Sequence, residues 1–288
     1  MASKDLGLVR PNVSAMRNFE YGGKNLIEIF GSISALSEAV VAGDFSEINV
    51  GDYVQVTLSG NFYDYAAGAT KSINQVMTFE AMPDFYINTN GMDRGTHHIL
   101  FLSRDLLGQN LQMRSEAGTW YDSSVTNPWL GSHLYQTFNN KSNGIRALME
   151  NTILAGHIYD PSGNGSGISQ FAETKASGAA SATSWANYKK GALFLPSECE
   201  VWGHPAFSEA RVLGNASAQQ SLQWPIFVGS HRHIQKSNTP GGGRGYWWVA
   251  SSSADSAGVF CGVGNRGMPY STSAADTDIG APVGFLFR

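Results

Sequence analysis

Charged residues are scarce in this chain. Lys, Arg, Asp and Glu together make up 15% of its 288 residues, and the formal net charge is −4 at pH 7. An ordinary globular protein has about a quarter of its residues charged. Because no basic excess attracts phosphates or anionic lipids, we expect neither nucleic acid nor a membrane surface as a partner.

Cysteines and long apolar runs are also lacking. The two cysteines, Cys199 and Cys261, each sit inside an apolar run. Two are too few for the disulfide framework of a small secreted domain, so we predict reduced, buried thiols. No apolar stretch reaches the roughly 20 residues that span a bilayer, and residues 1–5 lead into a polar segment rather than a signal peptide. These features predict a protein made in a cytoplasm and not inserted into a membrane.

Glycine and aromatic residues are plentiful instead. The chain has 33 glycines, 42% of its residues are hydrophobic and 11% are aromatic. This composition and length suit a globular body with a large core and a polar but uncharged surface. Residues 160–187 are rich in Gly, Ser and Ala, and we interpret them as an insertion because strand patterns resume afterwards.

Three apolar runs close the chain, at residues 246–249, 258–263 and 282–287. Each is short, aromatic or β-branched, and bounded by Gly, Ser, Asn or Pro, which is typical of strands. They predict a terminal antiparallel meander, with a long loop at residues 264–280 between its second and third strands. The final apolar strand must be buried beside strands formed earlier in the chain.

The earlier part of the chain predicts an α+β fold. Apolar residues at helical spacing between Ser32 and Gly43 predict a short helix with a serine cap and a glycine end. The other predicted elements are strands over residues 48–58, 75–81, 98–102 and 193–196, a polar loop over 61–74, and helices over 131–138, 144–154 and 198–202.

Residues 1–30 show no clear periodicity, and Gly22-Gly23 interrupts them. We predict an extended N-terminal arm that packs on a partner subunit or on its own body, followed by one globular domain over residues 31–288.

The closing segments "YWWVASSSADSAGVFCGVGNRG" and "TDIGAPVGFLFR" resemble the end of an uncharacterised domain family of gut Firmicutes and their bacteriophages, a family that looks C-type-lectin-like. The segments "GDFSEINVGDYVQVTLSG", "THHILFLSRDLLGQNLQM", "GSHLYQTF" and "LFLPSECEVWG" occur in the order shown by the phage members. The resemblance therefore covers residues 31–288. The chain departs from it in "GAPVGFLF", where Arg usually precedes Pro, and in "WWVASS", where Leu-Arg is usual.

The resemblance implies a C-type-lectin-like domain in a bacteriophage virion structural protein, a head fibre or capsid decoration protein made in the host bacterial cytoplasm. Its domain would adhere to a host-surface glycan or protein, and its arm would contact other virion proteins. We expect a homo-oligomer and favour a trimer. The alternatives are a tail receptor-binding protein, a bacterial surface adhesin, and a lectin-fold enzyme related to formylglycine-generating enzymes.

No catalytic, metal or cofactor site is expected from the sequence. In a strand, the neighbours His97 and His98 point to opposite faces, so this pair cannot chelate zinc as it stands, and the same holds for the residues around His233. The turn at residues 160–165 lacks the dense acidic spacing of a calcium loop. The isolated cysteines have no cationic neighbours that would lower a thiol pKa.

A binding face is predicted on the closing strands. Alternation sends Trp247 to one side and Tyr246 with Trp248 to the other, so one set is expected on an open face. Long polar loops on a rigid sheet commonly carry binding residues. The predicted ligand-binding residues are Trp248, Asn265, Arg266, Tyr270, Asp276 and Asp278.

Overall fold

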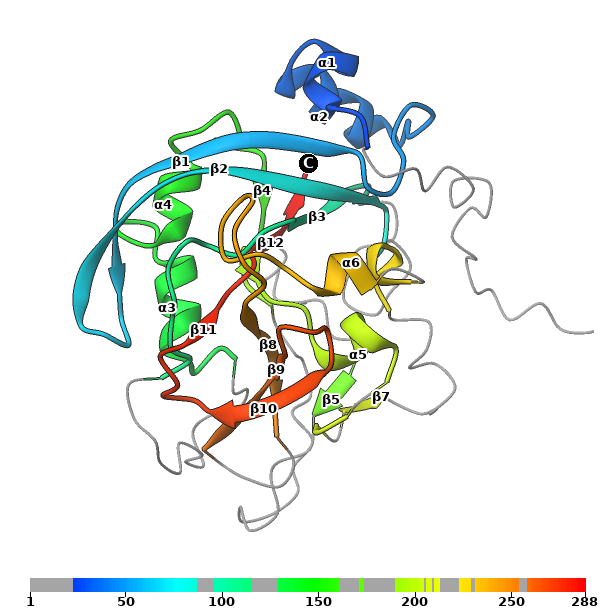
Figure 1. The fold of residues 1–288 in the computed structure, drawn as a ribbon. Helices are drawn as coiled ribbons and strands as arrows, with labels where there is room; N and C mark the ends of the chain where they lie inside the picture. The colour runs from blue at the N-terminus through cyan, green and yellow to red at the C-terminus, as the bar shows by residue number, and fades with distance from the viewer. Residues whose placement is uncertain are drawn as a thin grey trace, which may run out of the picture.

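The computed structural model describes residues 23–86, 96–114, 129–160, 171–173, 190–204, 206–208, 210–212, 223–228, 231–253 and 258–288. Residues 1–22 of the predicted arm, and most of the predicted insertion at 160–187, lie outside these ranges. The described chain is a mixed α+β structure with mostly antiparallel sheets and few helices (Figure 1). The predicted α+β class is confirmed at this level.

A six-stranded sheet contains the closing strand of the chain. Its order is β1-β2-β3-β12-β4, and β6 also pairs with β12, all antiparallel. Its strands are β1 (Tyr53–Asp64), β2 (Ala69–Pro83), β3 (Ile99–Ser103), β4 (Ile158–Tyr159), β6 (Leu193–Phe194) and β12 (Gly284–Phe287).

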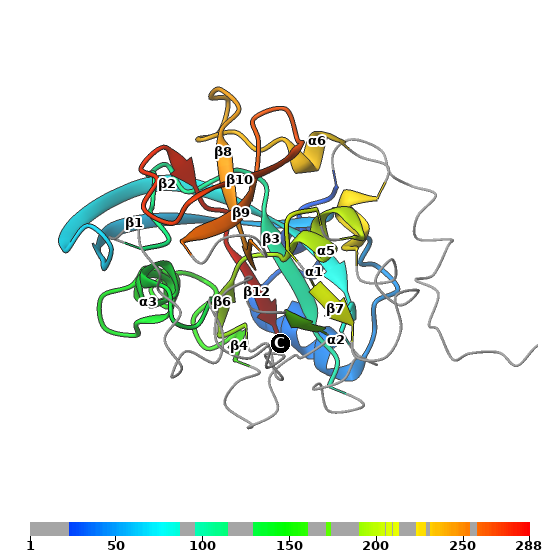
Figure 2. The same cartoon turned by 90° about the horizontal axis from the view of Figure 1, so that it is seen from below.

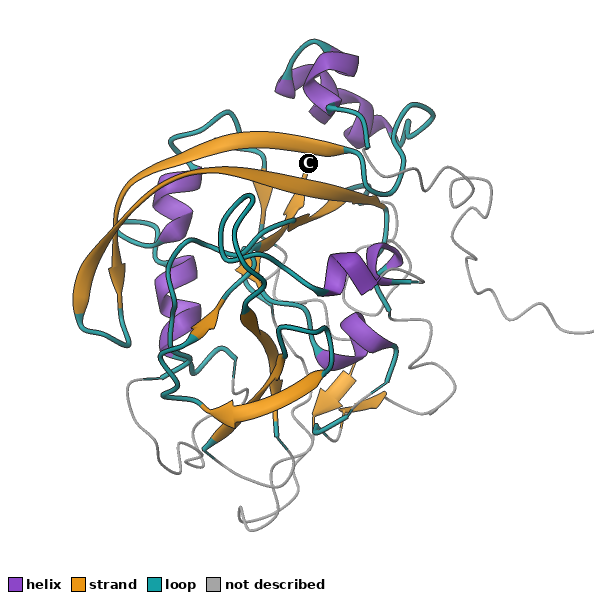
Figure 3. Ribbon diagram, viewed as in Figure 1, coloured by secondary structure: helices purple, strands orange, loops and turns teal. Residues whose placement is uncertain are grey.

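The hairpin of β1 and β2 is much longer than predicted and arches over one side of the body (Figure 3). The predicted polar loop at 61–74 is wrong, because pairing continues until Asp64 faces Ala69. Phe62 and Ile73 are buried, as are Asp64 and Ala66 between them, while residues 67–70 at the tip of the hairpin are exposed. A half-exposed hairpin tip of this kind has too few apolar residues to be recognised from their alternation.

A second sheet of four strands has the order β10-β9-β8-β11. Its members are β8 (Tyr246–Ser252), β9 (Val259–Val263), β10 (Pro269–Ser273) and β11 (Ile279–Gly280), with β11 parallel to β8. A separate two-stranded sheet pairs β5 (Phe171–Glu173) with β7 (Ala210–Val212).

The predicted three-stranded terminal meander is therefore wrong in its third strand. β8 and β9 pair as expected, but β10 takes the next place, and β12 crosses to the first sheet. All four residues of β12 are buried, so it needs neighbours on both edges and covers on both faces. The predicted loop at 264–280 contains β10 and β11, whose few and mainly polar residues gave no strand pattern.

The helices are short and follow local signals in the sequence. In α2 (Ile33–Ala42), the Ser32 side chain accepts a hydrogen bond from the Ala35 N–H, and Gly43 ends the helix with φ 73°, as predicted. α5 (Glu198–Trp202) starts with a complete capping box. The others are α1 (Leu26–Phe30), α3 (His133–Asn139), α4 (Ile145–Met149), α6 (His231–Ile234) and the 3₁₀ helix η4 (Pro225–Phe227). Two helices differ from the prediction. Helix α1 forms inside the segment predicted as an extended arm, and α4 is shorter than the predicted helix at residues 144–154.

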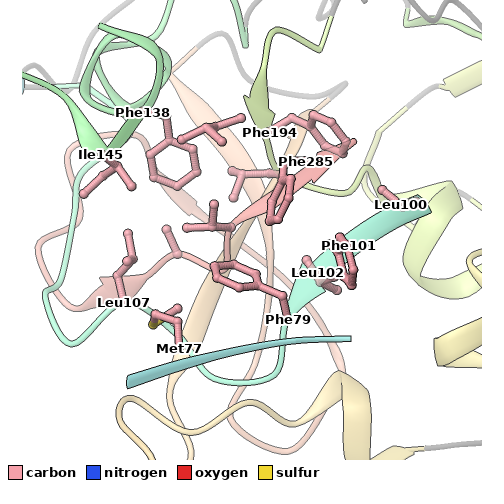
Figure 4. Packing of buried hydrophobic residues seen from close by; sticks show 14 of the residues in the cluster. Met77, Phe79, Leu100, Phe101, Leu102, Leu107, Phe138, Ile145, Phe194 and Phe285 are labelled. Atoms are coloured by element: carbon pink, nitrogen blue, oxygen red, sulfur yellow. The ribbon is translucent and has the colours of Figure 1, made fainter. Parts of the chain in front are cut away.

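The core is centred on the closing strand. In Figure 4 the Phe285 ring lies among side chains of β2, β3 and β6. Its centroid is 5.1 Å from that of Phe79 and 5.4 Å from that of Phe101. The prediction that the final strand lies between earlier strands is confirmed. Cys199 and Cys261 are buried thiols, also as predicted.

Candidate functional site

The β9–β10 hairpin carries most of the predicted binding residues. Its turn is closed by a hydrogen bond from the Gly264 N–H to the Met268 carbonyl (2.8 Å) and by another from the Gly267 N–H to the Gly264 carbonyl (2.8 Å). Gly267 has φ 81°, a backbone conformation that residues other than glycine rarely adopt. The Gln235 amide donates to the Arg266 carbonyl at 2.8 Å. The turn therefore holds Asn265 and Arg266 on a fixed tip.

Two tyrosines form the aromatic part of this face. The rings of Tyr246 and Tyr270 lie with centroids 4.9 Å apart at 54°, and both residues are half-buried. In the sheet register Tyr270 faces Gly262, which has no side chain to cover the ring. The pair thus keeps part of its aromatic surface open to solvent.

The two predicted carboxylates have different roles. Asp276 accepts hydrogen bonds from the Thr272 hydroxyl (2.8 Å) and from the Asp278 N–H (2.9 Å), so both of its carboxylate oxygens hold the loop together. Asp278 has an exposed side chain. We therefore assign Asp276 to loop structure and keep Asp278 as a contact residue.

Trp248 does not belong to this face, which corrects the prediction. It is fully buried, and its indole Nε1–H donates to the Leu111 carbonyl at 2.7 Å. Trp247 is buried as well and donates to the Ile234 carbonyl at 2.9 Å. The sheet is covered on both sides here, so alternation exposes neither tryptophan. The unbroken apolar run from Trp247 to Ala250 was the sequence signal for two buried faces.

The resulting surface, which we call the tip face, consists of Tyr246, Asn265, Arg266, Met268, Tyr270 and Asp278. Sequence reasoning missed Met268, which is 66% exposed. The tip face offers one cation, one carboxylate, an amide and aromatic rings on a rigid support. These groups suit hydrogen bonding and stacking against a ligand.

A buried charged cluster lies between β2, β3 and α6. The Glu80 carboxylate accepts hydrogen bonds from Arg104 Nε (2.9 Å) and pairs with His233 Nδ1 (3.1 Å). Burial alone would raise the pKa of Glu80, but His233, Arg104 and Lys236 outweigh it and hold the pKa below its usual value. Lys236 is buried nearby and donates to the Ser103 carbonyl at 2.5 Å. Burial lowers the pKa of Lys236 to about 8.

The lowered pKa of Lys236 predicts a pH-dependent stability. Below about pH 8 the amine is charged in both the folded and the unfolded protein, whereas between pH 8 and 10.5 only the unfolded chain holds the proton. Because the unfolded state then binds more protons, this group makes stability rise with pH across that window, by about 3 kcal/mol at most. Urea unfolding at pH 7.5 to 10 should show the rise in the wild type relative to Lys236→Met. Parallel pH profiles for the two proteins would contradict this prediction.

A second buried cluster joins α5 to the chain before it. The Glu200 carboxylate accepts hydrogen bonds from Lys190 Nζ (2.6 Å), the Tyr86 hydroxyl (2.5 Å) and the Ser197 N–H (2.8 Å). The Trp224 indole donates to the Tyr86 hydroxyl at 3.1 Å. Every one of these residues is buried, so the cluster holds the fold and offers no surface to a ligand.

The histidines considered as metal ligands are used differently. His97 Nδ1 contacts the Asp84 carboxylate at 2.7 Å, while the buried His98 contacts the Thr96 carbonyl at 3.0 Å. Burial lowers the pKa of His98. Within the described ranges there is no group of three or more His, Cys, Asp or Glu side chains placed to hold a metal ion. Nor does any described helix have the length and apolar character needed to cross a membrane.

Comparison with known proteins adds no assignment: no family model, no curated protein and no solved structure matches this chain.

Proposed function

We propose that this chain is a bacteriophage virion structural protein, a head fibre or capsid decoration protein, whose folded domain adheres to a host-surface protein or glycan. The resemblance of its sequence motifs supplies the class of protein. The observation that supports a binding role is the tip face, where two half-buried tyrosines lie beside polar side chains on a turn fixed by hydrogen bonds. The proposed localisation is the virion.

The position of the tip face fits display on a particle. In Figure 1 strand β10 lies at one end of the molecule and the helices α1 and α2 lie at the other. Seen from below, in Figure 2, β10 is on the side facing the viewer. Since the predicted arm leads into α1, attachment to other virion proteins through the arm would leave the tip face pointing outward.

A C-type-lectin-like architecture is part of the proposal. The arrangement that favours it is a small antiparallel sheet, β8 to β10, followed by a last strand that returns beside β3 in the first sheet. Several of the motifs that carry the resemblance include residues of β3, β8, β9 and β12. The two buried thiols favour binding over the thiol chemistry of the related enzymes.

Adhesion through so small a face needs many copies. The tip face carries one positive and one negative side chain, so electrostatic steering adds little to each contact. Several copies on one particle supply avidity without any further contact. We therefore propose a homo-oligomer, with a trimer favoured, that presents its tip faces together.

The proposal predicts that Arg266→Ala, Tyr270→Ala and Asp278→Ala, combined in one protein, reduce adsorption of assembled particles to host cells by about tenfold or more. Asp276 stays intact because it holds the loop. A matched triple alanine variant at the exposed residues Thr57, Val76 and Asn151, on the β1–β2 side of the molecule, should adsorb normally. Undiminished adsorption of the tip variant would refute the adhesive role. Labelled particles viewed by electron microscopy would separate a capsid position from the tail tip, the place of a receptor-binding protein.

A further inference from the structure

The helices α1 and α2 form a lobe at the edge of the molecule whose surface is unusually apolar. Leu26, Leu36 and Val40 are buried and join the lobe to the core. Other aliphatic and aromatic side chains of the lobe remain partly open to solvent, and Val41 is 49% exposed. The partly buried ones are Ile27, Ile29, Phe30 and Ile33. We call this surface the helical lobe.

Charge is nearly absent from the two helices. Glu28 and Glu38 are their only charged side chains, and neither helix has a Lys or Arg. Surface helices normally place charged residues on their exposed side. Of the exposed side chains on the two helices, Glu28, Ser34 and Glu38 are polar, while Val41 and Ala42 are apolar. Four half-buried apolar side chains add to this surface, so the lobe combines apolar area with few charges, as the core of an interface does.

Residues 1–22 are complementary to the helical lobe in both respects. Residues 23–52 contain one lysine and five carboxylates, a formal charge of −4, whereas residues 1–22 contain three basic and two acidic side chains, a charge of +1. Residues 1–22 also carry apolar side chains that no regular period gathers on one face: Leu6, Leu8, Val9, Val13, Met16 and Phe19. The composition of residues 1–22 is therefore apolar and slightly basic, which suits an apolar surface beside negative charge.

Residues 23–25, which follow the N-terminal segment, are held against the start of β1. The Lys24 N–H donates to the Asp52 carboxylate (2.8 Å), and the Tyr53 N–H donates to the Lys24 carbonyl (2.9 Å). Asn25 pairs with Tyr53 in parallel. A Cβ on Gly23 would lie 1.9 Å from the Gly51 carbonyl oxygen, so this stretch is tightly held against the start of β1.

Residues 23–25 lie along the start of β1 and continue directly into α1. An extended chain of 22 residues spans about 70 Å, which is long enough to reach the helical lobe of a neighbouring copy.

We propose that the helical lobe binds residues 1–22 of a second copy of this chain, so that exchanged N-terminal segments hold an oligomer together. The contact is mainly apolar and is assisted by the opposite charges of the two surfaces. It is separate from the tip face, so it stands or falls independently of the adhesive function.

The first test measures association of the full-length protein. The substitution Val41→Glu places a charge in the proposed contact and should weaken self-association about tenfold or more by light scattering. The matched control is Ile153→Glu, because Ile153 is 47% exposed in the segment after α4, outside the helical lobe, and should not change association. Equal association of both variants and the wild type would overturn the proposal.

The second test identifies the occupant of the lobe. A tagged chain with Val9→Cys is mixed with an untagged chain carrying Val41→Cys and then oxidised; the native cysteines are buried and should not compete. A disulfide between the two chains is the expected product, and a partner with Ile153→Cys should give none. If a chain bearing both Val9→Cys and Val41→Cys links only to itself, or if no link forms in any mixture, binding by a second copy is refuted.

Discussion

Replacement of Phe285 by alanine is expected to lower the free energy of unfolding by about 3 to 5 kcal/mol. Phe285 is fully buried in β12, where it faces Phe101 across the pairing with β3 and Leu193 across the pairing with β6. The ring also packs edge-on against Phe79 of β2. Removing it opens a cavity among three strands that cannot all move inward, so little of the loss is recovered by relaxation.

Chemical denaturation followed by tryptophan fluorescence measures this loss. The matched control is Phe207→Ala, which removes the same side chain from a position where it is 37% exposed, and which should cost below about 1 kcal/mol. The backbone N–H of Phe207 stays bound to the Glu198 carboxylate in that variant. A Phe285→Ala protein as stable as the control would mean that β12 does not occupy the centre of the sheet.

The parts of the fold that were predictable depend on local signals. Helix α2 lies between a serine that caps it and a glycine that ends it, and α5 begins with Ser197 and Glu200 in a capping box. β12 was recognised because all its residues are apolar. In each case the physical cause lies within a few residues of the element, so the sequence alone identified it.

The pairing of strands was less predictable, because partners are chosen by packing between distant segments. Nothing near β12 shows that its neighbours are β3, β4 and β6 rather than β9. Strand β10 has half-exposed residues that are mainly Ser and Thr, and it is held by hydrogen bonds of its backbone to β9. Backbone pairing leaves no mark in the pattern of side chains, so β10 was predicted as loop.

The candidate site was predicted in part for the same reason. Asn265, Arg266 and Tyr270 do lie together on the tip face, since a turn between two strands places its residues at the surface. Trp248 was placed there on the assumption of one open face, which a second layer of side chains over β8 removes. The internal role of Asp276 depends on the conformation of its loop, which only the structure shows.

An effect of similar size is expected at the buried ion pair between Lys190 and Glu200. The Lys190 side chain is 2% exposed, and its amine is 2.6 Å from the Glu200 carboxylate. The amine also lies over the faces of Phe194 and Trp224, with ring centroids 5.1 and 5.6 Å away. These rings cannot replace the lost carboxylate as a partner for the buried charge.

The substitution Glu200→Ala should therefore destabilise the protein by about 3 to 5 kcal/mol, because it removes a carboxylate that contacts a buried cation at 2.6 Å. It also removes the acceptor for the Tyr86 hydroxyl and the Ser197 N–H. By contrast, Glu150→Ala should cost about 1 kcal/mol or less, since the Glu150 side chain is 37% exposed and its distance to Arg146 is 3.8 Å. Denaturant unfolding of the two variants and the wild type would measure both losses in the free energy of unfolding.

A double-mutant cycle separates the charge effect from the other losses. The variant Lys190→Met with Glu200→Met lacks both charges of this pair, so it should be more stable than Glu200→Met alone, in which the lysine remains. It should still be less stable than the wild type, because the Tyr86 hydroxyl and the Ser197 N–H have lost their shared acceptor. If the double variant were no more stable than the single one, the cost would lie in those hydrogen bonds and in α5 capping rather than in the unpaired amine.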